Sequence, residues 1–333
     1  MRHFVKQVSF ERMPSPQRNP SAWREHIARH WSLTANRSEP PFLGVSEIRT
    51  LLSRHMPELL PDFDALLPLY GGGPGAAQGL ALYNQRPFWA GCSVQVARRP
   101  GHATLLRNYD GGVEDCPCAF RFEALNGGGW ILGSAEGGWG YLDGMNDRGL
   151  AIALTFGGRF VTGPGFTVIL VIRWLLQTCA GVDQALARLA EAQIPHRMAQ
   201  SLVLLDRGGA HAVVYLSPDR EMVVERWLVG CTNHQGRVEA QEYGAFTRTA
   251  ERLAHLQARD GALTLADFLQ PPLYQQRYVE HFGTLYSAEY DPGAETLRVA
   301  WPERELVLTP QSAPVRFTVN YIQEEPPGSG AAE

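Results

Sequence analysis

The sequence has few cysteines, no long hydrophobic run and no recognisable secretory signal. Its five cysteines are an odd number and too few for a disulfide framework in 333 residues, so we expect free thiols in a reducing, cytoplasmic setting. The most apolar run, 167–176, contains Arg173 and is much shorter than the roughly 20 residues that a membrane-spanning helix needs. The first residues lack the apolar stretch of a signal peptide. We therefore expect no insertion into a membrane.

Net charge is also nearly absent. The chain has 30 Lys and Arg against 34 Asp and Glu, a formal charge of −4, with no block of like charges. This balance argues against a dedicated nucleic-acid binder or a polybasic membrane-surface protein. Hydrophobic residues make up 44% of the chain, enough to bury a large core.

The predicted secondary structure changes near residue 91. We predict that 1–91 is mainly helical, because proline-rich connectors separate helix-like segments near 22–31, 46–55 and 76–83. The second part, 92–322, consists mostly of short strand-like runs with glycine-rich turns. The tail, 323–333, is rich in Pro, Gly and Glu and is expected to be disordered.

Two helices interrupt the strand-like runs of the second part. They are expected at 166–179 and 182–192, where apolar residues recur at helical spacing, and strands resume after them. Further helices are expected at 247–257 and 265–269. Strands and helices that alternate in blocks favour an α+β fold in which helices cover a pair of antiparallel sheets.

Two kinds of motif suggest cofactors but lack the residues to bind them. The glycine-rich stretch 71–75 has no Lys-Ser/Thr pair of a phosphate loop and does not join a strand to a helix. Cys116 and Cys118 flank a proline, and no second Cys/His pair lies at metal-site spacing. We expect no cofactor and no metal.

Cys92 is the strongest candidate for a reactive residue. It opens a strand-like run that the turn residues Pro100 and Gly101 join to a second run. A hairpin of these two runs brings Arg107 and Asp110 back near Cys92. A guanidinium beside a thiol favours the thiolate that a nucleophilic cysteine needs. The alternative is that Cys92 is a small buried side chain beside a structural ion pair.

Four segments decide between these interpretations. They are Gly91-Cys92-Ser93 with Leu106-Arg-Asn-Tyr-Asp110, the segment Asp143-Gly-Met-Asn-Asp-Arg-Gly-Leu-Ala-Ile152, the segment Cys231-Thr-Asn-His234, and the segment Phe246-Thr-Arg-Thr-Ala-Glu-Arg252. In this order and at these spacings they resemble the acyltransferase-type N-terminal-nucleophile (Ntn) hydrolases. That family includes acyl-coenzyme A:isopenicillin N acyltransferase and has bile-salt hydrolases and penicillin V acylases as relatives.

The resemblance implies a four-layer αββα sandwich and a precursor that cuts itself before its nucleophile. The bond concerned is Gly91–Cys92, where glycine removes the Cβ atom that would obstruct an attack on the carbonyl. The freed α-amine, with an ordinary pKa of about 7.7–8.0, can then act as base for the thiol of the same residue. The prefix 1–91 is expected to stay bound to the catalytic domain 92–322 after cleavage.

The resemblance also assigns roles to individual residues. Asp110 would orient the Cys92 amine, Arg107 would stabilise the thiolate or contact substrate, and Asn233 would donate to the oxyanion. Thr155 stands where bile-salt hydrolases have a further Asn, so a backbone N–H can replace that donor. The family's late arginine corresponds to either Arg248 or Arg252.

The expected activity is that of an amidohydrolase or acyltransferase which acts on a small acyl substrate, either an amide or an acyl-thioester. Two alternatives stay open. One is a thiol hydrolase that is not processed and uses a Cys92/His234 pair, and the other is a catalytically silent binding protein on the same fold. Formation of a homo-oligomer also stays open.

Overall fold

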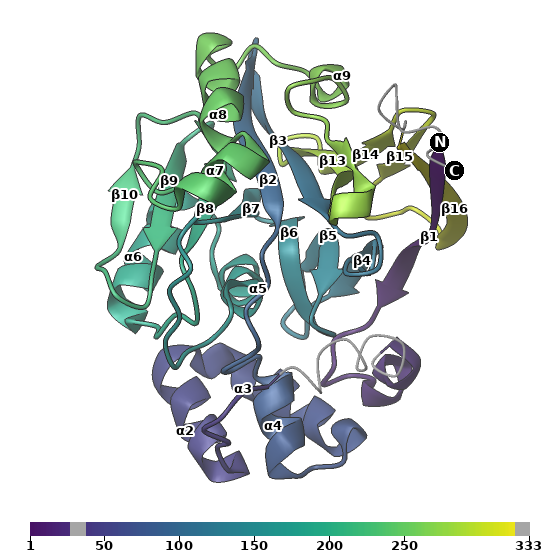
Figure 1. Cartoon of the computed structure of the whole chain (residues 1–333). Helices are drawn as coiled ribbons and strands as arrows, with labels where there is room; N and C mark the ends of the chain where they lie inside the picture. Colours follow the sequence, from purple (N-terminus) through teal and green to yellow (C-terminus); the bar gives the residue numbers. More distant parts are fainter. Residues whose placement is uncertain (27–37, 324–333) are drawn as a thin grey trace, which may run out of the picture.

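The computed structural model describes residues 1–26 and 38–323. The larger of its two sheets has nine strands and runs through the middle of the molecule (Figure 1). These strands are β1 (Arg2–Met13), β4 (Ala119–Ala124), β5 (Trp130–Glu136), β6 (Gly140–Asn146), β7 (Leu150–Phe156), β8 (Gln200–Asp206), β9 (His211–Leu216), β10 (Val223–Glu225) and β16 (Val315–Gln323). Their order is β10-β9-β8-β7-β6-β5-β4-β1-β16. Neighbouring strands are antiparallel except β1 and β4, which run parallel.

A second, antiparallel sheet of seven strands carries Cys92. Its strands are β2 (Gly91–Arg99), β3 (His102–Gly111), β11 (Gly230–Cys231), β12 (Gln276–Arg277), β13 (Phe282–Asp291), β14 (Thr296–Trp301) and β15 (Arg304–Leu308). The main order is β11-β2-β3-β13-β14-β15, and β12 pairs with β13. Strand β2 lies against β7 of the larger sheet. The two sheets are therefore stacked face to face.

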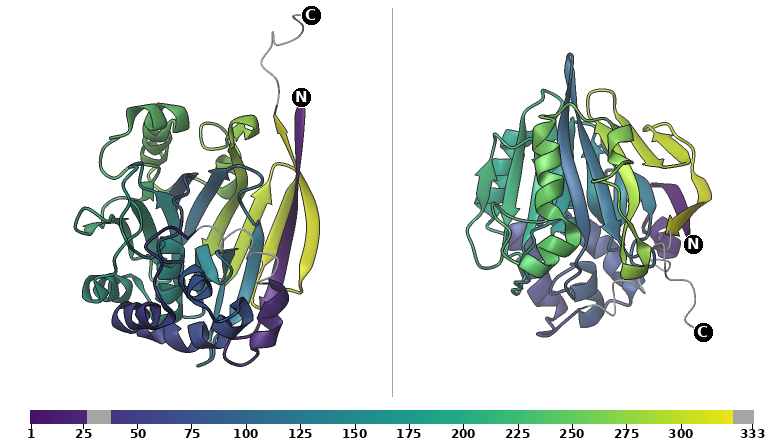
Figure 2. Two further views of the ribbon diagram at one scale, coloured as in Figure 1. Left: turned by 60° about the horizontal axis from the view of Figure 1, so that its bottom comes forward. Right: turned by 45° about the horizontal axis from the view of Figure 1, so that its top comes forward.

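Helices cover the outer face of each sheet (Figures 1 and 2). Helices α5 (Val168–Thr178) and α6 (Val182–Ala192) pack on the larger sheet, and α7 (Gln241–Thr247), α8 (Thr249–Ala258) and α9 (Leu265–Phe268) lie over the smaller one. In the right-hand view of Figure 2, the green α8 lies beside β2. This arrangement confirms the expected helix–sheet–sheet–helix order.

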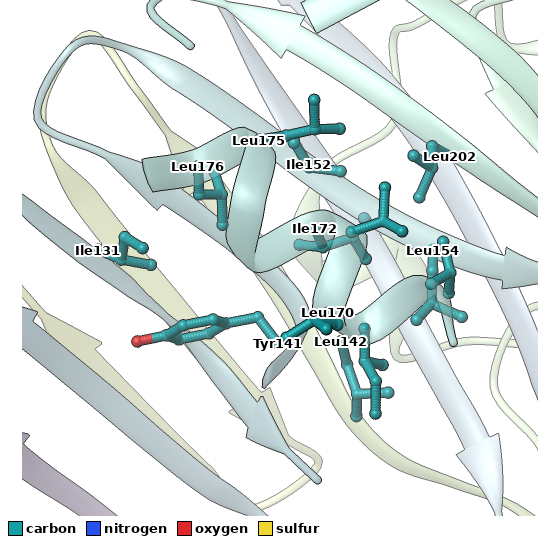
Figure 3. Close-up of a cluster of buried hydrophobic side chains, with 14 of the residues drawn as sticks. Ile131, Tyr141, Leu142, Ile152, Leu154, Leu170, Ile172, Leu175, Leu176 and Leu202 are labelled. Carbon is teal, nitrogen blue, oxygen red and sulfur yellow. The ribbon is translucent and has the colours of Figure 1, made fainter. Parts of the chain in front are cut away.

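Helix α5 is buried along most of its length because it lies between the larger sheet and the prefix helices. Its residues from Val168 to Leu176 are all buried. Figure 3 shows its apolar side chains packed against strands β5 to β8, where the labelled contacts are Ile131, Tyr141, Leu142, Ile152, Leu154, Leu170, Ile172, Leu175, Leu176 and Leu202. On the side of the prefix, the indole N–H of Trp174 donates to Glu58 over 2.8 Å. A mostly apolar helix fits this position, and its one charged residue, Arg173, is paired with buried Glu123.

The prefix contains the α-helices α2 (Val45–His55), α3 (Leu60–Leu66) and α4 (Pro74–Leu80), together with short 3-10 helices at Pro20–Ala22, Pro57–Leu59 and Leu67–Tyr70. A further 3-10 turn, Tyr278–Glu280, precedes β13. The helices expected at 46–55 and 76–83 correspond to α2 and α4. Part of the helix expected at 22–31 lies outside the described residues.

Sequence analysis did not predict strand β1 or helix α3, and β1 matters more for the fold. It belongs to the prefix, yet it lies inside the larger sheet, where Phe10 is paired with Phe120 of β4 on one side and with Val315 of β16 on the other. Phe10 and Val8 are fully buried. The prefix is therefore helical in most of its length and also supplies one strand of the sandwich.

The C-terminal end of the described chain is Gln323, the last residue of β16. The remaining residues of the tail that we expected to be disordered, 324–333, lie outside the described part. None of the helices within residues 1–26 and 38–323 has both the length and the apolar character of a membrane-spanning helix.

Candidate active site

The expected hairpin between β2 and β3 is present and surrounds Cys92 with charged groups. The turn passes through Gly101 at φ +83°, a conformation that favours glycine. Cys92 lies opposite Tyr109 in the register, and its side chain is fully buried. Arg107 donates from Nη2 to the Cys92 Sγ over 3.3 Å. The guanidinium is thus the side chain that contacts the thiol.

Gly91 is enclosed so closely that no other residue fits without rearrangement. A Cβ atom at this position would lie 2.4 Å from the Phe282 ring and 2.9 Å from the Asp110 Cβ. Gly91 also faces Asp110 directly in the β2–β3 register. The requirement for glycine before Cys92, which we had inferred from its chemistry, is therefore also steric.

Arg252 connects the groups on the other face of β2. From α8, its Nη1 donates to the Cys92 carbonyl oxygen over 2.7 Å and to the Ser93 hydroxyl over 2.9 Å. It also forms an ion pair with Asp110 over 3.3 Å, and both of these side chains are fully buried. Nη2 donates to the Asn233 amide oxygen over 2.6 Å. Arg252 therefore bridges Cys92, Asp110 and Asn233.

Asn233 holds the peptide groups on both sides of Gly91. Its amide oxygen accepts the backbone N–H of Cys92 over 2.9 Å. Its Nδ2 group donates to the carbonyl oxygens of Ala90 and Phe156, each over 3.3 Å. Because this residue supplies both an acceptor and a donor, it fixes the Gly91–Cys92 peptide bond beside the thiol.

Burial dominates the electrostatics of the thiol. It raises the pKa of Cys92 from 9.0 to about 11, although Arg107, Arg252 and the backbone N–H of Phe156 act in the opposite direction. The neighbouring guanidinium favours the thiolate, as expected, but desolvation outweighs this attraction. Burial likewise raises the pKa of Asp110, while Arg252 and a 2.7 Å hydrogen bond from Thr284 oppose the shift.

Asp143 is a buried partner of Arg107 that sequence analysis did not assign to the site. Its carboxylate forms an ion pair with the Arg107 guanidinium and accepts hydrogen bonds from the hydroxyls of Tyr286, over 2.8 Å, and Tyr290. The residue begins the Asp-Gly-Met-Asn segment that we had used only to identify the family, and that segment was the available signal. Arg107 is therefore held between the thiol and a carboxylate.

Three further candidates, Thr155, Arg248 and His234, form their observed contacts with groups other than the Cys92 thiol. Thr155 contacts Cys231, with 3.4 Å between its Oγ1 and the sulfur. Arg248 forms an exposed ion pair with Glu251. His234 places its Nδ1 2.9 Å from the Thr249 hydroxyl, and burial lowers its pKa. Of the two late arginines, the structure brings Arg252 to Cys92.

A cavity of about 320 Å³ lies next to these groups. The residues that precede the Gly91–Cys92 bond, from Gln85 to Ala90, line this cavity, and so does Tyr109. Cys116 also lines it, with its sulfur 3.5 Å from that of Cys118. In the part of the chain that the structure describes, no cluster of three or more His, Cys, Asp or Glu side chains has the geometry of a metal site.

Comparison with solved structures gives distant matches. A mutant of conjugated bile acid hydrolase from Clostridium perfringens has 12% identity and a TM-score of 0.45, over 66% of this chain and 92% of that one. Penicillin V acylase from Agrobacterium tumefaciens has 14% identity and a TM-score of 0.39, over 65% and 84% of the two chains. The Caenorhabditis elegans N-acylethanolamine-hydrolyzing acid amidase ortholog has 14% identity and a TM-score of 0.40, over 61% and 93%.

Comparison with family profiles is more informative. No curated protein sequence matches the chain. The profile of acyl-coenzyme A:6-aminopenicillanic acid acyl-transferase matches residues 97–306, well over half of the chain. This range contains Arg107, Asp110, Asn233 and Arg252, and it begins shortly after Cys92. The chain belongs to the acyl-coenzyme A:6-aminopenicillanic acid acyl-transferase family.

Proposed function

We propose that the chain is a self-processing cysteine amidohydrolase or acyltransferase whose nucleophile is Cys92. The observation that carries the proposal is the enclosure of one peptide bond, Gly91–Cys92. Its N–H is bound by Asn233, the following carbonyl by Arg252, and the adjacent thiol by Arg107. The family match supports acyl transfer or amide hydrolysis as the general reaction.

The first reaction is cleavage of the chain itself. The Cys92 sulfur attacks the Gly91 carbonyl carbon, the C–N bond to Cys92 breaks, and the thiol proton passes to the departing amine. Water then hydrolyses the Gly91 thioester, which leaves a Gly91 carboxylate and restores the thiol. Because burial keeps the Cys92 thiol protonated near neutral pH, we expect this step to be faster at alkaline pH.

The second reaction uses the new α-amine of Cys92 as general base. Asn233 Oδ1 already lies 2.9 Å from this nitrogen, and Arg252 connects it to Asp110. The amine takes the thiol proton while the sulfur attacks the carbonyl of an acyl substrate, and it returns the proton to the leaving group. Water or an acceptor amine then releases the acyl group from Cys92.

Cleavage also changes what Asn233 can do. Its Nδ2 group donates to the Ala90 carbonyl in the uncut chain. When the new end of the small chain moves away, this donor becomes available for the oxyanion of a substrate. We therefore assign Asn233 two successive roles, positioning the bond to be cut and then stabilising the tetrahedral intermediate.

Denaturing electrophoresis tests the proposal. Active wild-type protein should give two pieces of about 10 kDa and about 27 kDa, in proportion to the lengths of 1–91 and 92–333 in a 36.9 kDa chain. The larger piece should begin Cys-Ser-Val-Gln-Val on N-terminal sequencing. Cys92→Ala should stay in one piece and be inactive toward acyl amides and acyl-thioesters. Cys179→Ala, which removes another buried thiol, should be cut and active.

Two results would contradict the proposal. The first is an intact chain of about 37 kDa that turns over substrate, because the thiol would then need a base other than its own amine. The second is substrate turnover by Cys92→Ala, which would place the nucleophile elsewhere.

A further inference from the structure

Four aromatic rings gather beside the bond that we propose is cut. This aromatic cluster consists of Trp89, Phe156, Phe160 and Tyr243. The Trp89 ring centroid lies 4.8 Å from that of Phe156 and 4.7 Å from that of Phe160. Tyr243 meets Phe156 and Phe160 nearly at right angles, over 5.2 and 5.3 Å. Tilted and edge-to-face pairs at such distances attract each other beyond simple burial.

The cluster is unusual because two of its rings face solvent. Trp89 is 42% exposed and Phe160 is 51% exposed, whereas Phe156 is buried. Phe160 lies on the glycine-rich segment that follows β7, and the preceding residue fixes this segment. Arg159 forms ion pairs with Asp219 over 2.5 Å and with Glu239 over 3.3 Å. Phe160 is therefore held facing Trp89 by its backbone and is not part of the core.

The cluster is directly connected to the reacting atoms. The backbone N–H of Phe156 lowers the pKa of the Cys92 thiol, so it lies beside the sulfur. The Tyr243 hydroxyl donates to the Ala90 carbonyl over 3.0 Å, one residue before Gly91. Residues Gln85 to Ala90 also line the cavity of about 320 Å³. Because this segment borders open space, it has room to shift. Contacts made by Trp89 oppose such a shift.

We propose that Phe156, Phe160 and Tyr243 form a binding site for an aromatic ring. In the uncut chain the indole of Trp89 occupies this site. This contact holds the Gly91 carbonyl in reach of Cys92. Trp89 and Phe160 are then positioning residues for self-cleavage. The inference rests on the proposed cleavage at Gly91–Cys92. A reacting carbonyl must be held close to its nucleophile, and small displacements slow such steps strongly.

The test is a time course of cleavage during cell-free synthesis of the full chain, followed on denaturing gels. Trp89→Ala and Phe160→Ala should each slow the appearance of the two pieces by about tenfold or more, since each removes ring contacts that fix the bond. Trp89→Phe keeps an aromatic ring and should restore most of the wild-type rate. Trp227→Ala removes a tryptophan that is 72% exposed outside the cluster and should cleave at the wild-type rate.

A second measurement separates positioning from folding. Each substitution is repeated in the Cys92→Ala background, where no cleavage occurs, and thermal unfolding is recorded. We expect midpoints close to that of Cys92→Ala alone, because the Trp89 and Phe160 side chains are only about half buried. A drop in midpoint that parallels the drop in cleavage rate, in the Phe variant as in the Ala variants, would overturn the positioning role.

The outcomes also distinguish this inference from the proposed function. If the wild-type chain is never cut at Gly91–Cys92, the proposed function fails. If the wild type is cut and Trp89→Ala is cut equally fast, the proposed function stands and the role of the aromatic cluster is refuted.

Discussion

Cleavage at Gly91–Cys92 would break one covalent bond but leave the small chain built into the sandwich. Strand β1, which the small chain supplies, lies between β4 and β16 in the larger sheet. It is paired with β16 over nine residues and with β4 over five. Since β16 is hydrogen-bonded to the sheet through β1, loss of the small chain would also detach the last strand of the large chain. We therefore predict that the two pieces stay together.

The structure also sets the size of this effect. The small chain contributes fully buried apolar side chains from β1 and its helices, namely Val8, Phe10, Trp23, Ile48, Leu52, Met56, Leu59, Phe63 and Leu66. At about 1.5–3 kcal/mol each, their burial amounts to roughly 20 kcal/mol before ordering costs. Asp62 adds a buried ion pair with Arg173 of the large chain over 3.2 Å.

Size-exclusion chromatography and thermal unfolding at two protein concentrations check this prediction. Cut protein should elute as one species of the same size as the uncut Cys92→Ala control, and its two pieces should separate only in denaturant. Its unfolding midpoint should rise with protein concentration, because unfolding now releases two chains, whereas that of Cys92→Ala should not. A folded large chain that elutes alone, without the small chain, would refute the reasoning.

Three further predictions concern the reacting groups. Asn233→Ala should lower kcat by about 10²–10³ with a smaller change in KM, as expected for a missing oxyanion donor. The control Asn108→Ala, at a buried Asn of β3 that bonds to α9 and the following turn, should keep kcat. A change in KM alone would make Asn233 a binding residue. Asp110→Asn should slow cleavage and lower the free energy of unfolding by about 3–5 kcal/mol, since buried Arg252 loses its carboxylate partner; normal cleavage in this variant would remove Asp110 from the site. Burial raises the Cys92 pKa to about 11, so the fraction of thiolate grows with pH in the neutral range. Self-cleavage after a pH jump should therefore accelerate about tenfold per pH unit between pH 7 and 9. A rate that does not change with pH would contradict attack by the thiolate.

The contacts around Cys92 could be predicted largely from the sequence because they depend on short-range structure. The hairpin turn at Pro100 and Gly101 fixes the register, and the register alone brings Arg107 and Asp110 to the first residues of β2. Asn233 could be included because its segment resembles a family motif at the end of a strand. Its bond to the Cys92 N–H, however, spans 141 residues and depends on how β11 pairs with β2.

Two features could not be predicted because they depend on the direction of side chains or on distant pairing. Arg248 and Arg252 are one helical turn apart, and the left-handed backbone at Arg248, with φ +52°, begins α8 so that Arg252 faces inward. The pattern of Phe4, Val8 and Phe10 in β1 is compatible with a strand, but the segment is short of apolar residues, with Lys6, Gln7 and Ser9 between them. Its partners, β4 and β16, lie more than 100 residues away.

Arg107 shows why the charge state of the thiol also required the structure. Sequence analysis places a guanidinium beside Cys92, which favours the thiolate, and leaves open a buried thiol beside a structural ion pair. In the structure the same guanidinium is paired with Asp143 on its other side, so part of its charge is neutralised. Desolvation then exceeds the remaining attraction, and the thiol is neutral in the uncut chain. A neutral thiol needs a base to react with a substrate, and under the proposed function the α-amine that cleavage would release is that base.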